Sequence, residues 1–325
     1  MPTYNRVDLL PETIKTILSQ DYEDLELLIV DDGSTDKTAE VIKEIQAQDQ
    51  RLRYIQLPEN RGIGFARQAG LEHISGIFIA LADSDDLWLP GKLTSQIDVL
   101  EKHPEIEILF GDFWNIDCIR GTEASGFAES QTGMKHLVVR PLADDLWLVE
   151  GGIEIGILKS NFIAVPTMVI RASVFKKVGG FDTNLGTRED FEFNWRAAVL
   201  GAQFAYLNQL LIERYRNESS VTARTIETKV GDKLKALKTC RQTYEMARRP
   251  DLVIQIRAAE HHAWRKLLWM YGHNGQRARA FRAYGKNLHC GFSTRNLLVF
   301  GAALMGPQAA SLALSFIKRV RATSS

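Results

Sequence analysis

Three carboxylates crowd the turn that follows a short apolar run in this chain. Residues 77–82 read Ile-Phe-Ile-Ala-Leu-Ala and predict a buried strand, and Asp83, Asp85 and Asp86 come directly after it. In an open α/β sheet, ligands bind beyond the carboxyl ends of the strands. Mg²⁺ and Mn²⁺ suit oxygen ligands, and a cation would relieve the repulsion between the carboxylates. The turn is therefore either a divalent-cation site or a solvated acidic turn before a helix that begins near Pro90.

A second acidic pair, Asp31 and Asp32, follows the predicted strand at 25–30. Parallel neighbouring strands would place both acidic turns on one rim of the sheet, where a carboxylate can bond a base edge or a ribose hydroxyl. The sequence contains no glycine-rich phosphate loop, so a metal on the first turn is expected to hold the phosphates. Arg61 or Arg67 could add positive charge. Either could instead be a solvated surface side chain, which is the simpler expectation for Arg61.

Strand-like and helix-like segments alternate along the first half of the chain. The expected strands are residues 25–30, 54–57, 77–82 and 106–110, and further strands are expected at 164–171 and 205–212. This alternation predicts an α/β fold with a mostly parallel sheet flanked by helices. From about residue 226 the pattern is helical to the end, whereas residues 115–165 show no clear order.

The composition excludes several classes of protein. The chain has 325 residues, of which 45% are hydrophobic and 25% charged, and forty basic residues balance forty acidic ones. With zero net charge, the chain lacks the surplus of basic residues that is typical of proteins that bind nucleic acid. Three scattered cysteines favour neither a disulfide framework nor a zinc site and fit a reducing compartment. No signal peptide is expected, because no basic segment followed by an apolar run opens the chain, so we expect a cytoplasmic protein.

Several short motifs, in this order and spacing, resemble the family 2 glycosyltransferases, which have the GT-A fold. They lie at residues 2–6 (PTYNR), 30–36 (VDDGSTD), 60–70 (NRGIGFARQAG), 83–90 (DSDDLWLP), 178–182 (VGGFD) and 189–198 (EDFEFNWRAA). The resemblance covers about residues 1–222. It implies a GT-A (Rossmann-like) catalytic domain at residues 1–225, followed by a helical region at 226–325.

The resemblance also implies roles for individual positions. A nucleotide-sugar donor, expected to be a UDP-sugar, would be bound by Thr3, Tyr4, Asp32, Arg67 and Asp85. In this set Tyr4 lies beside the base, Asp32 bonds its uracil-like edge, Arg67 lies near the base or diphosphate, and Asp85 approaches the ribose. Asp86 would ligate Mn²⁺ or Mg²⁺, while Asp83 shapes the turn or binds outer-shell water.

Asp190 is the expected general base. An acceptor hydroxyl must lose its proton as it attacks the anomeric carbon, and a positioned carboxylate can take that proton. A metal would stabilise the departing diphosphate as a Lewis acid. Asp190 is also a favourable residue at a helix N-terminus, which is the alternative interpretation. The resemblance favours the base and implies inversion at the anomeric carbon, whereas the adjacent Glu189 would point in another direction.

Two features depart from the family pattern. Family members carry an apolar strand directly before the first motif, but only Met1 precedes Pro2 here, so either the true start lies upstream or the chain is truncated. Loss of that strand would expose two sheet edges. The segment 215–222 has Asn217 and Glu218 where many members carry a histidine, which leaves a metal or diphosphate contact from that loop open.

The apolar run at 297–317 is interrupted by Pro307 and Gln308 and followed by basic residues. It predicts short helices lying on the inner face of the plasma membrane, although helices packed on the protein would show the same pattern. The acceptor is expected to be a cell-surface glycan or a lipid-linked glycan.

Three other functions are compatible with parts of the pattern. A nucleotidyltransferase would also use carboxylates and a metal, but it would usually bring a phosphate loop that is absent here. A degenerate member would only bind nucleotide or carbohydrate, and the missing first strand favours it whereas Asp86 and Asp190 oppose it. A glycoside hydrolase would also use two carboxylates, but it needs no nucleotide donor.

Overall fold

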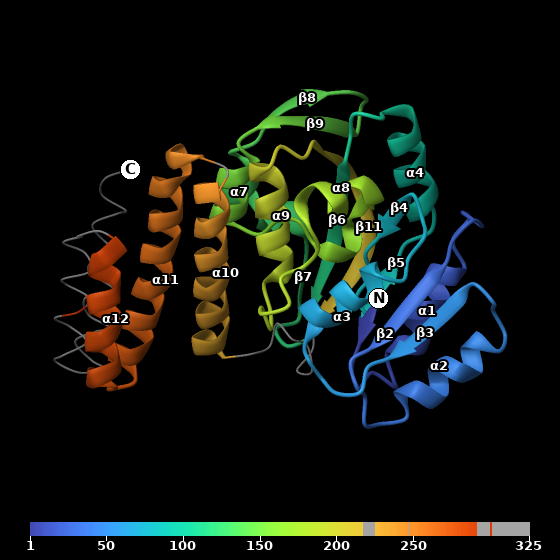
Figure 1. Ribbon diagram of the computed structural model, residues 1–325, viewed down its shortest axis with the longest axis horizontal. Helices are drawn as coiled ribbons and strands as arrows, with labels where there is room; N and C mark the ends of the chain where they lie inside the picture. The colour runs from blue at the N-terminus through green and yellow to red at the C-terminus, as the bar shows by residue number, and fades with distance from the viewer. Residues whose placement is uncertain (217–224, 247, 291–299, 301–325) are drawn as a thin grey trace. The chain divides into compact units, whose positions relative to one another are not determined.

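The computed structural model of the chain describes residues 1–216, 225–246, 248–290 and 300. The chain divides into two compact units, Met1–Ala223 and Arg224–Ser325. The first unit combines strands with helices, and the described part of the second is helical (Figure 1).

A small parallel sheet opens the first unit. Its strands are β1 (Pro2–Thr3), β2 (Leu27–Asp31) and β3 (Leu52–Gln56), in that spatial order. All five residues of β2 are buried, as expected for a parallel strand covered on both faces. Helices α1 (Leu10–Leu18) and α2 (Thr38–Gln46) connect these strands, and their apolar stripes pack in one core with β2. Strand β2 therefore leads directly into the turn at Asp31 and Asp32, the second acidic pair noted in the sequence.

The second sheet has eight strands and is mixed rather than mostly parallel. Its order is β4-β10-β6-β11-β9-β8, with β5 paired to β11 and β7 paired to β6. The bounds are β4 (Phe78–Ala80), β5 (Asp86–Trp88), β6 (Ile108–Asp117), β7 (Thr122–Ser125), β8 (Val138–Pro141), β9 (Leu146–Gly151), β10 (Val169–Arg171) and β11 (Phe204–Arg216). Among these pairs β6 and β11 run parallel, whereas the others are antiparallel. The α/β class is confirmed, but the expectation of a mostly parallel sheet is wrong for this part, because hairpins and reversed strands fill residues 115–171.

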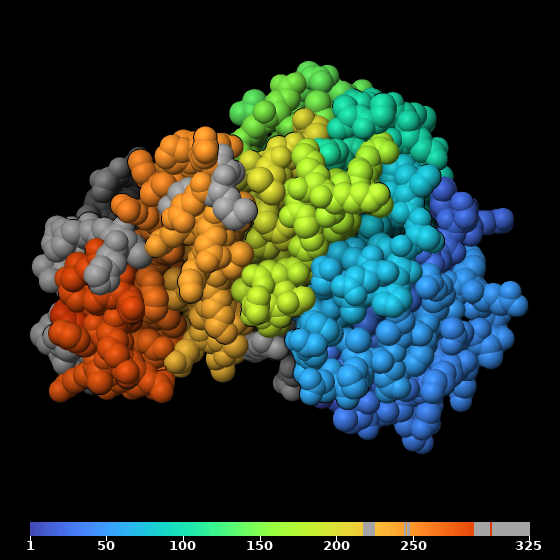
Figure 2. Space-filling view, viewed as in Figure 1, coloured from blue at the N-terminus to red at the C-terminus, as the bar shows by residue number. Residues whose placement is uncertain are grey.

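Helices cover these sheets. The longer ones in the first unit are α3 (Ile63–Leu71), α4 (Lys92–Lys102), α7 (Ile153–Lys159), α8 (Ala172–Val178) and α9 (Glu189–Val199). The short helices α5 (Gly126–Glu129), α6 (Gln131–Met134) and η1 (Val165–Thr167) complete it. Figure 2 shows α3 and the turn at 182–186 side by side on the surface. A Cβ atom on Gly64 would lie 3.0 Å from the carbonyl oxygen of Leu185, so only glycine fits this approach without displacement.

Two predicted strands are shorter than expected. The run at 77–82 forms a strand at Phe78–Ala80 alone, and these residues are half-buried while Ile77 is 75% exposed. The expectation of a fully buried strand is wrong, because one edge of β4 borders a cavity instead of another strand. The segment predicted as a strand at 164–171 begins with a 3₁₀ turn at Val165–Thr167, since Pro166 has no N–H to donate to a sheet.

Lys92 is a buried cation that the sequence did not reveal. Its side chain is 1% exposed, its Nζ donates to Gln96 Oε1 at 2.8 Å and lies 3.9 Å from the centre of the Trp88 ring. Burial lowers the pKa of Lys92 to about 7. An ammonium in these surroundings costs free energy at neutral pH, even with its partners.

Replacing Lys92 with methionine should therefore stabilise the protein at pH 7. The unfolded state binds more protons than the folded state between pH about 7 and the ordinary lysine pKa, so the stability of the wild type rises with pH over this range. The advantage of Lys92→Met should be largest at pH 7 and should shrink towards pH 10. Urea unfolding at several pH values measures it, with the exposed Lys15→Met as control. An advantage that does not change with pH would contradict the prediction.

The described part of the second unit is a helical bundle. It contains α10 (Ile226–Met246), the 3₁₀ turn η3 (Pro250–Leu252), α11 (Val253–His273) and α12 (Arg277–Cys290). Its core includes Val230, Ala263, Leu267, Leu268, Tyr271, Ala280 and Ala283. Within the described residues, no helix has the length and apolarity needed to cross a membrane. The expectations for the 215–222 loop and the 297–317 tail fall almost entirely outside the described residues.

Candidate active site

The acidic turn lies between the second sheet and the first. Asp86 opens β5 opposite Arg214 on β11, and its side chain is nearly inaccessible at 2% exposure. Burial raises the pKa of Asp86 well above its usual range, and the charges of Asp83 and Asp85 raise it further while Arg214 opposes them. The fold therefore holds three carboxyl groups close enough to disfavour one another's ionisation.

Asp85 contacts the N-terminal motif. Its carboxylate lies 3.7 Å from a guanidinium nitrogen of Arg6. Burial and the neighbouring Asp83 raise the pKa of Asp85 to about 6, despite the attraction of Arg6. In the part of the chain that the structure describes, no three His, Cys, Asp or Glu side chains form a ready metal cage. The donor set instead fits the mode in which one or two carboxylates share a divalent cation with substrate phosphates.

Asp32 holds the turn that leads into α3. Its two carboxylate oxygens accept hydrogen bonds from the backbone N–H groups of Arg61, at 2.8 Å, and Gly62, at 2.7 Å. Burial raises the pKa of Asp32, and these two hydrogen bonds oppose the rise. Gly62 has a φ of 93°, which favours glycine at this position. Each oxygen keeps a further lone pair, so Asp32 can still accept a hydrogen bond from a base.

The N-terminal motif is held against the turn that follows β2. The backbone N–H of Asp32 donates to the Thr3 carbonyl at 2.8 Å, and that of Asn5 donates to Ser34 Oγ at 2.9 Å. Tyr4 is 40% exposed, whereas Thr3 is buried and its hydroxyl has no hydrogen-bond partner among the described residues. The structure thus brings Tyr4 and Asp32 to one rim, with Tyr4 as the accessible aromatic surface.

Asp190 lies in the first turn of α9 and accepts a hydrogen bond from Asn161 Nδ2 at 2.9 Å. The adjacent Glu189 is 3% exposed and points elsewhere, towards Arg67. Asn161 was missed by sequence reasoning because it lies in the stretch without periodic pattern. The two neighbouring carboxyl groups therefore have different partners, as expected for adjacent positions on a helix.

Arg67 joins the acidic turn to α9. Its side chain is 4% exposed, and its guanidinium forms ion pairs with Asp83 and with Glu189. It is therefore not a solvated surface residue. Its charge pairs with these two carboxylates and also attracts Asp190. Burial raises the pKa of Glu189 to about 7, and Arg67 opposes that rise. Through Arg67, the acidic turn at 83–86 and the helix that carries Asp190 form one connected structure.

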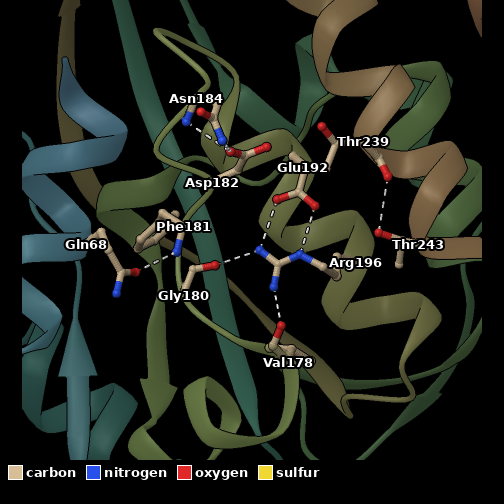
Figure 3. A network of polar contacts seen from close by, with 10 residues as sticks. All are labelled: Gln68, Val178, Gly180, Phe181, Asp182, Asn184, Glu192, Arg196, Thr239 and Thr243. Atoms are coloured by element: carbon tan, nitrogen blue, oxygen red, sulfur yellow. Dashed lines mark hydrogen bonds and ion pairs between the residues drawn. The ribbon is translucent and has the colours of Figure 1, made fainter. Parts of the chain in front are cut away.

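A second arginine fixes α9 against the turn at 178–182 (Figure 3). Arg196 donates to both oxygens of Glu192, at 2.8 and 3.0 Å, to the Gly180 carbonyl at 2.6 Å, and to the Val178 carbonyl. On the other side of this turn the backbone N–H of Phe181 donates to Gln68 on α3 at 3.0 Å. The motifs at 60–70, 178–182 and 189–198 are thus parts of one positioning network.

Comparison with known proteins identifies this arrangement. A family model described as "Glycosyl transferase family 2" matches residues 1–137. The chain is 27% identical over 233 residues to the uncharacterized glycosyltransferase MJ1057 of Methanocaldococcus jannaschii, which covers 71% of this chain and 74% of the relative. Residues 1–137 therefore match the family 2 glycosyltransferases. Two other relatives are matched over only 39% and 42% of their own length.

Two further similarities concern the fold and the N-terminal half of this glycosyltransferase. The crystal structure of Staphylococcus aureus TarS 1-349 with UDP-GlcNAc aligns with a TM-score of 0.58 at 17% identity, over 89% of this chain and 87% of that one. This confirms the GT-A fold. The Escherichia coli "UDP-Glc:alpha-D-GlcNAc-diphosphoundecaprenol beta-1,3-glucosyltransferase WfgD" is 35% identical over 113 residues, which are 35% of this chain and 44% of the relative.

Replacing Arg67 with methionine should destabilise this glycosyltransferase by about 3–5 kcal/mol, because it leaves Asp83 and Glu189 without their buried cation. The double variant Arg67→Met/Glu189→Gln should be more stable than Arg67→Met alone. It removes the charge of Glu189, one of the two carboxylates that the single variant leaves unpaired. Chemical denaturation of the four proteins of this double-mutant cycle measures the coupling. Strictly additive free energies of unfolding would contradict the buried pair.

Proposed function

We propose that this glycosyltransferase transfers a sugar from a UDP-sugar to an acceptor hydroxyl with inversion, using Mn²⁺ or Mg²⁺. The observation that carries the proposal is the buried Arg67, which links the acidic turn at 83–86 to Glu189, next to Asp190. Arg67 thereby connects the proposed metal-binding turn with the helix that carries the candidate base. Transfer between two substrates requires both groups to keep a fixed relative position. A nucleotidyltransferase would not need the second carboxylate in this place.

The donor side uses the rim between the two sheets. Tyr4 offers an exposed ring beside the base, Asp32 offers its remaining lone pairs to the uracil edge, and Thr3 contributes its unpartnered hydroxyl or its backbone. Asp85, with its raised pKa and its contact with Arg6, would face the ribose. Arg67 acts by positioning the turn rather than by touching the diphosphate.

Asp86 would hold the divalent cation, with Asp85 beside it. When bound, the metal supplies Lewis-acid stabilisation for the departing diphosphate. Burial raises the pKa of Asp86, and the charges of Asp83 and Asp85 raise it further. A cation would replace this repulsion by attraction, which is the physical reason to expect one there. A backbone hydrogen bond from Tyr215 reaches the Asp86 carboxyl, and the charge of Arg214 attracts it.

The acceptor side uses Asp190. Its carboxylate accepts the proton from the attacking hydroxyl, and the hydrogen bond from Asn161 restricts its orientation. Attack from the face opposite the diphosphate inverts the anomeric carbon. The name of WfgD gives UDP-Glc as its donor and a diphosphoundecaprenol-linked sugar as its acceptor. The TarS structure is a complex with UDP-GlcNAc. A lipid-linked or cell-surface glycan is therefore the acceptor class that we propose.

Calorimetric titration with UDP, with and without Mn²⁺, tests the donor site. We expect binding that is strengthened by Mn²⁺ and weaker binding of GDP, because Asp32 would face a different base edge. No binding of either nucleotide would favour a degenerate member of the family. Binding without turnover on any UDP-sugar, scored as free UDP released, would also favour that alternative.

We also propose peripheral contact with the inner face of the plasma membrane through the C-terminal region. The apolar sequence at 297–317 and the basic residues after it support this proposal. Flotation of the protein with vesicles containing anionic lipid should be lost when the chain is ended at residue 293. Equal flotation of both proteins would exclude this contact.

A further inference from the structure

A buried asparagine on α9 lacks the hydrogen bonds that its side chain can make. Asn194 is fully buried, and neither its Nδ2 nor its Oδ1 atom has a hydrogen-bond partner among the described residues. A carboxamide can donate two hydrogen bonds and accept two. An unpaired amide costs free energy in a protein interior, so an apolar residue would be the more stable choice here unless the amide has a use.

The position of Asn194 on α9 relates it to the proposed base. Asn194 follows Asp190 by four residues, and side chains at this spacing are neighbours on one side of an α-helix. Glu192, which lies between them in sequence, pairs with Arg196 instead. Asn194 is therefore the polar side chain one turn along α9 from the Asp190 carboxylate.

Helix α7 brings a second unpaired amide atom to Asp190. Trp195 Nε1 donates to the Glu154 carbonyl at 3.1 Å, so the start of α7 lies beside Trp195. Asn161, just beyond the end of α7, donates from Nδ2 to Asp190 at 2.9 Å. The two helices thus run side by side in opposite directions, and Asn194 lies between these two contacts along α9. The Oδ1 atom of Asn161 is buried and has no hydrogen-bond partner within the described part of the chain.

An internal water molecule fits these groups. A buried water typically makes two to four hydrogen bonds to polar groups that would otherwise be unpaired. The Nδ2 of Asn194 can donate to it, and the Oδ1 atoms of Asn194 and Asn161 can accept from it. Holding the Oδ1 of Asn161 also prevents its amide from turning over, so that Nδ2 stays directed at Asp190. The water would therefore fix the orientation of the base.

We propose that Asn194 is a positioning residue for Asp190, acting through an internal water molecule that it shares with Asn161. The water accepts a hydrogen bond from Asn194 and donates one to Asn161, which in turn donates to the Asp190 carboxylate. Asn194 touches neither donor nor acceptor, because its side chain is inaccessible to solvent. The consequence for transfer rests on the proposed role of Asp190 as the base, whereas the water site does not.

Nuclear magnetic resonance of the side-chain amides tests the water site without any substrate. We expect a cross-peak between the Asn194 Nδ2 protons and water, with the sign of a long-lived internal water. Asn194→Leu keeps the number of side-chain heavy atoms but removes the polar ones, and it should shift the Nδ2 signals of Asn161. Asn287→Leu is the matched control, because Asn287 is also fully buried but donates to the His261 carbonyl at 2.9 Å. It should leave the Asn161 signals in place. A missing water cross-peak, or unchanged Asn161 signals in Asn194→Leu, would overturn the inference.

Steady-state rates test the consequence for transfer. Asn194→Leu should lower kcat about tenfold and leave the KM for the UDP-sugar within about twofold of wild type, since Asn194 orients the base without touching the donor. Asn194→Ser leaves room for the water and offers it a hydroxyl, so it should retain most of the wild-type kcat. Equal losses in the two variants would assign Asn194 to packing alone, and a wild-type kcat in Asn194→Leu would contradict a positioning role. Wild-type turnover of Asp190→Asn would instead overturn the proposed base, and the amide spectra would still decide whether the water site exists.

Discussion

Replacing Asp190 with asparagine should lower the turnover by about 10²–10⁴-fold while UDP and donor binding stay unchanged. Asparagine keeps the size of the side chain and the contact with Asn161, but it cannot take a proton from the acceptor hydroxyl. The first turn of α9 should persist, because Glu189 and Glu192 keep their partners Arg67 and Arg196. Steady-state rates with saturating donor, together with UDP titration, measure the two effects separately.

The control for this variant is Asp144→Asn, which changes an exposed carboxylate in the turn between β8 and β9. Asn161→Ala provides a graded comparison, because it frees the Asp190 carboxylate to rotate but leaves the carboxylate itself in place. Its turnover should fall less than that of Asp190→Asn. Wild-type turnover of Asp190→Asn would show that another group takes the proton and that Asp190 is only a helix N-terminal residue.

Replacing Asp86 with alanine should abolish the strengthening of UDP binding by Mn²⁺. Asp86 is the most buried of the three carboxyl groups in the acidic turn; burial raises its pKa, and the other two carboxyl groups raise it further. Its removal takes away the proposed metal ligand and at the same time relieves repulsion on Asp83 and Asp85. The variant should therefore keep a cooperative thermal transition, so that the loss of metal dependence is not a loss of fold.

Calorimetric titration of UDP with and without Mn²⁺ measures this effect, and Asp98→Ala on the exposed face of α4 is the control. Unchanged metal dependence in Asp86→Ala would move the ligand to Asp85 or Asp83. A variant that binds UDP weakly in both conditions would instead give Asp86 a role in shaping the nucleotide pocket.

The family motifs could be located in the sequence because each has a local cause. The Asp31–Asp32 and Asp83–Asp86 turns follow apolar runs, and Asp190 precedes a helical stripe in which Trp195 is fully buried, as expected for packing. Residues 115–165 gave no such signal, and Asn161 and the antiparallel strands β7, β8 and β9 come from this region. β7 and β8 form hairpins with β6 and β9, but β9 also pairs with β11, which is distant in sequence, and local pattern does not encode that pairing.

The sequence by itself determined the family, the α/β class and the acidic residues that can do chemistry, since these depend on residue type and short-range order. The tertiary structure decided what each charge faces. It buried Arg67 between Asp83 and Glu189 and gave Asp190 the amide of Asn161. The physical reason is that burial and distance set the strength of an electrostatic contact. Both depend on how the chain packs and cannot be read from the order of its residues.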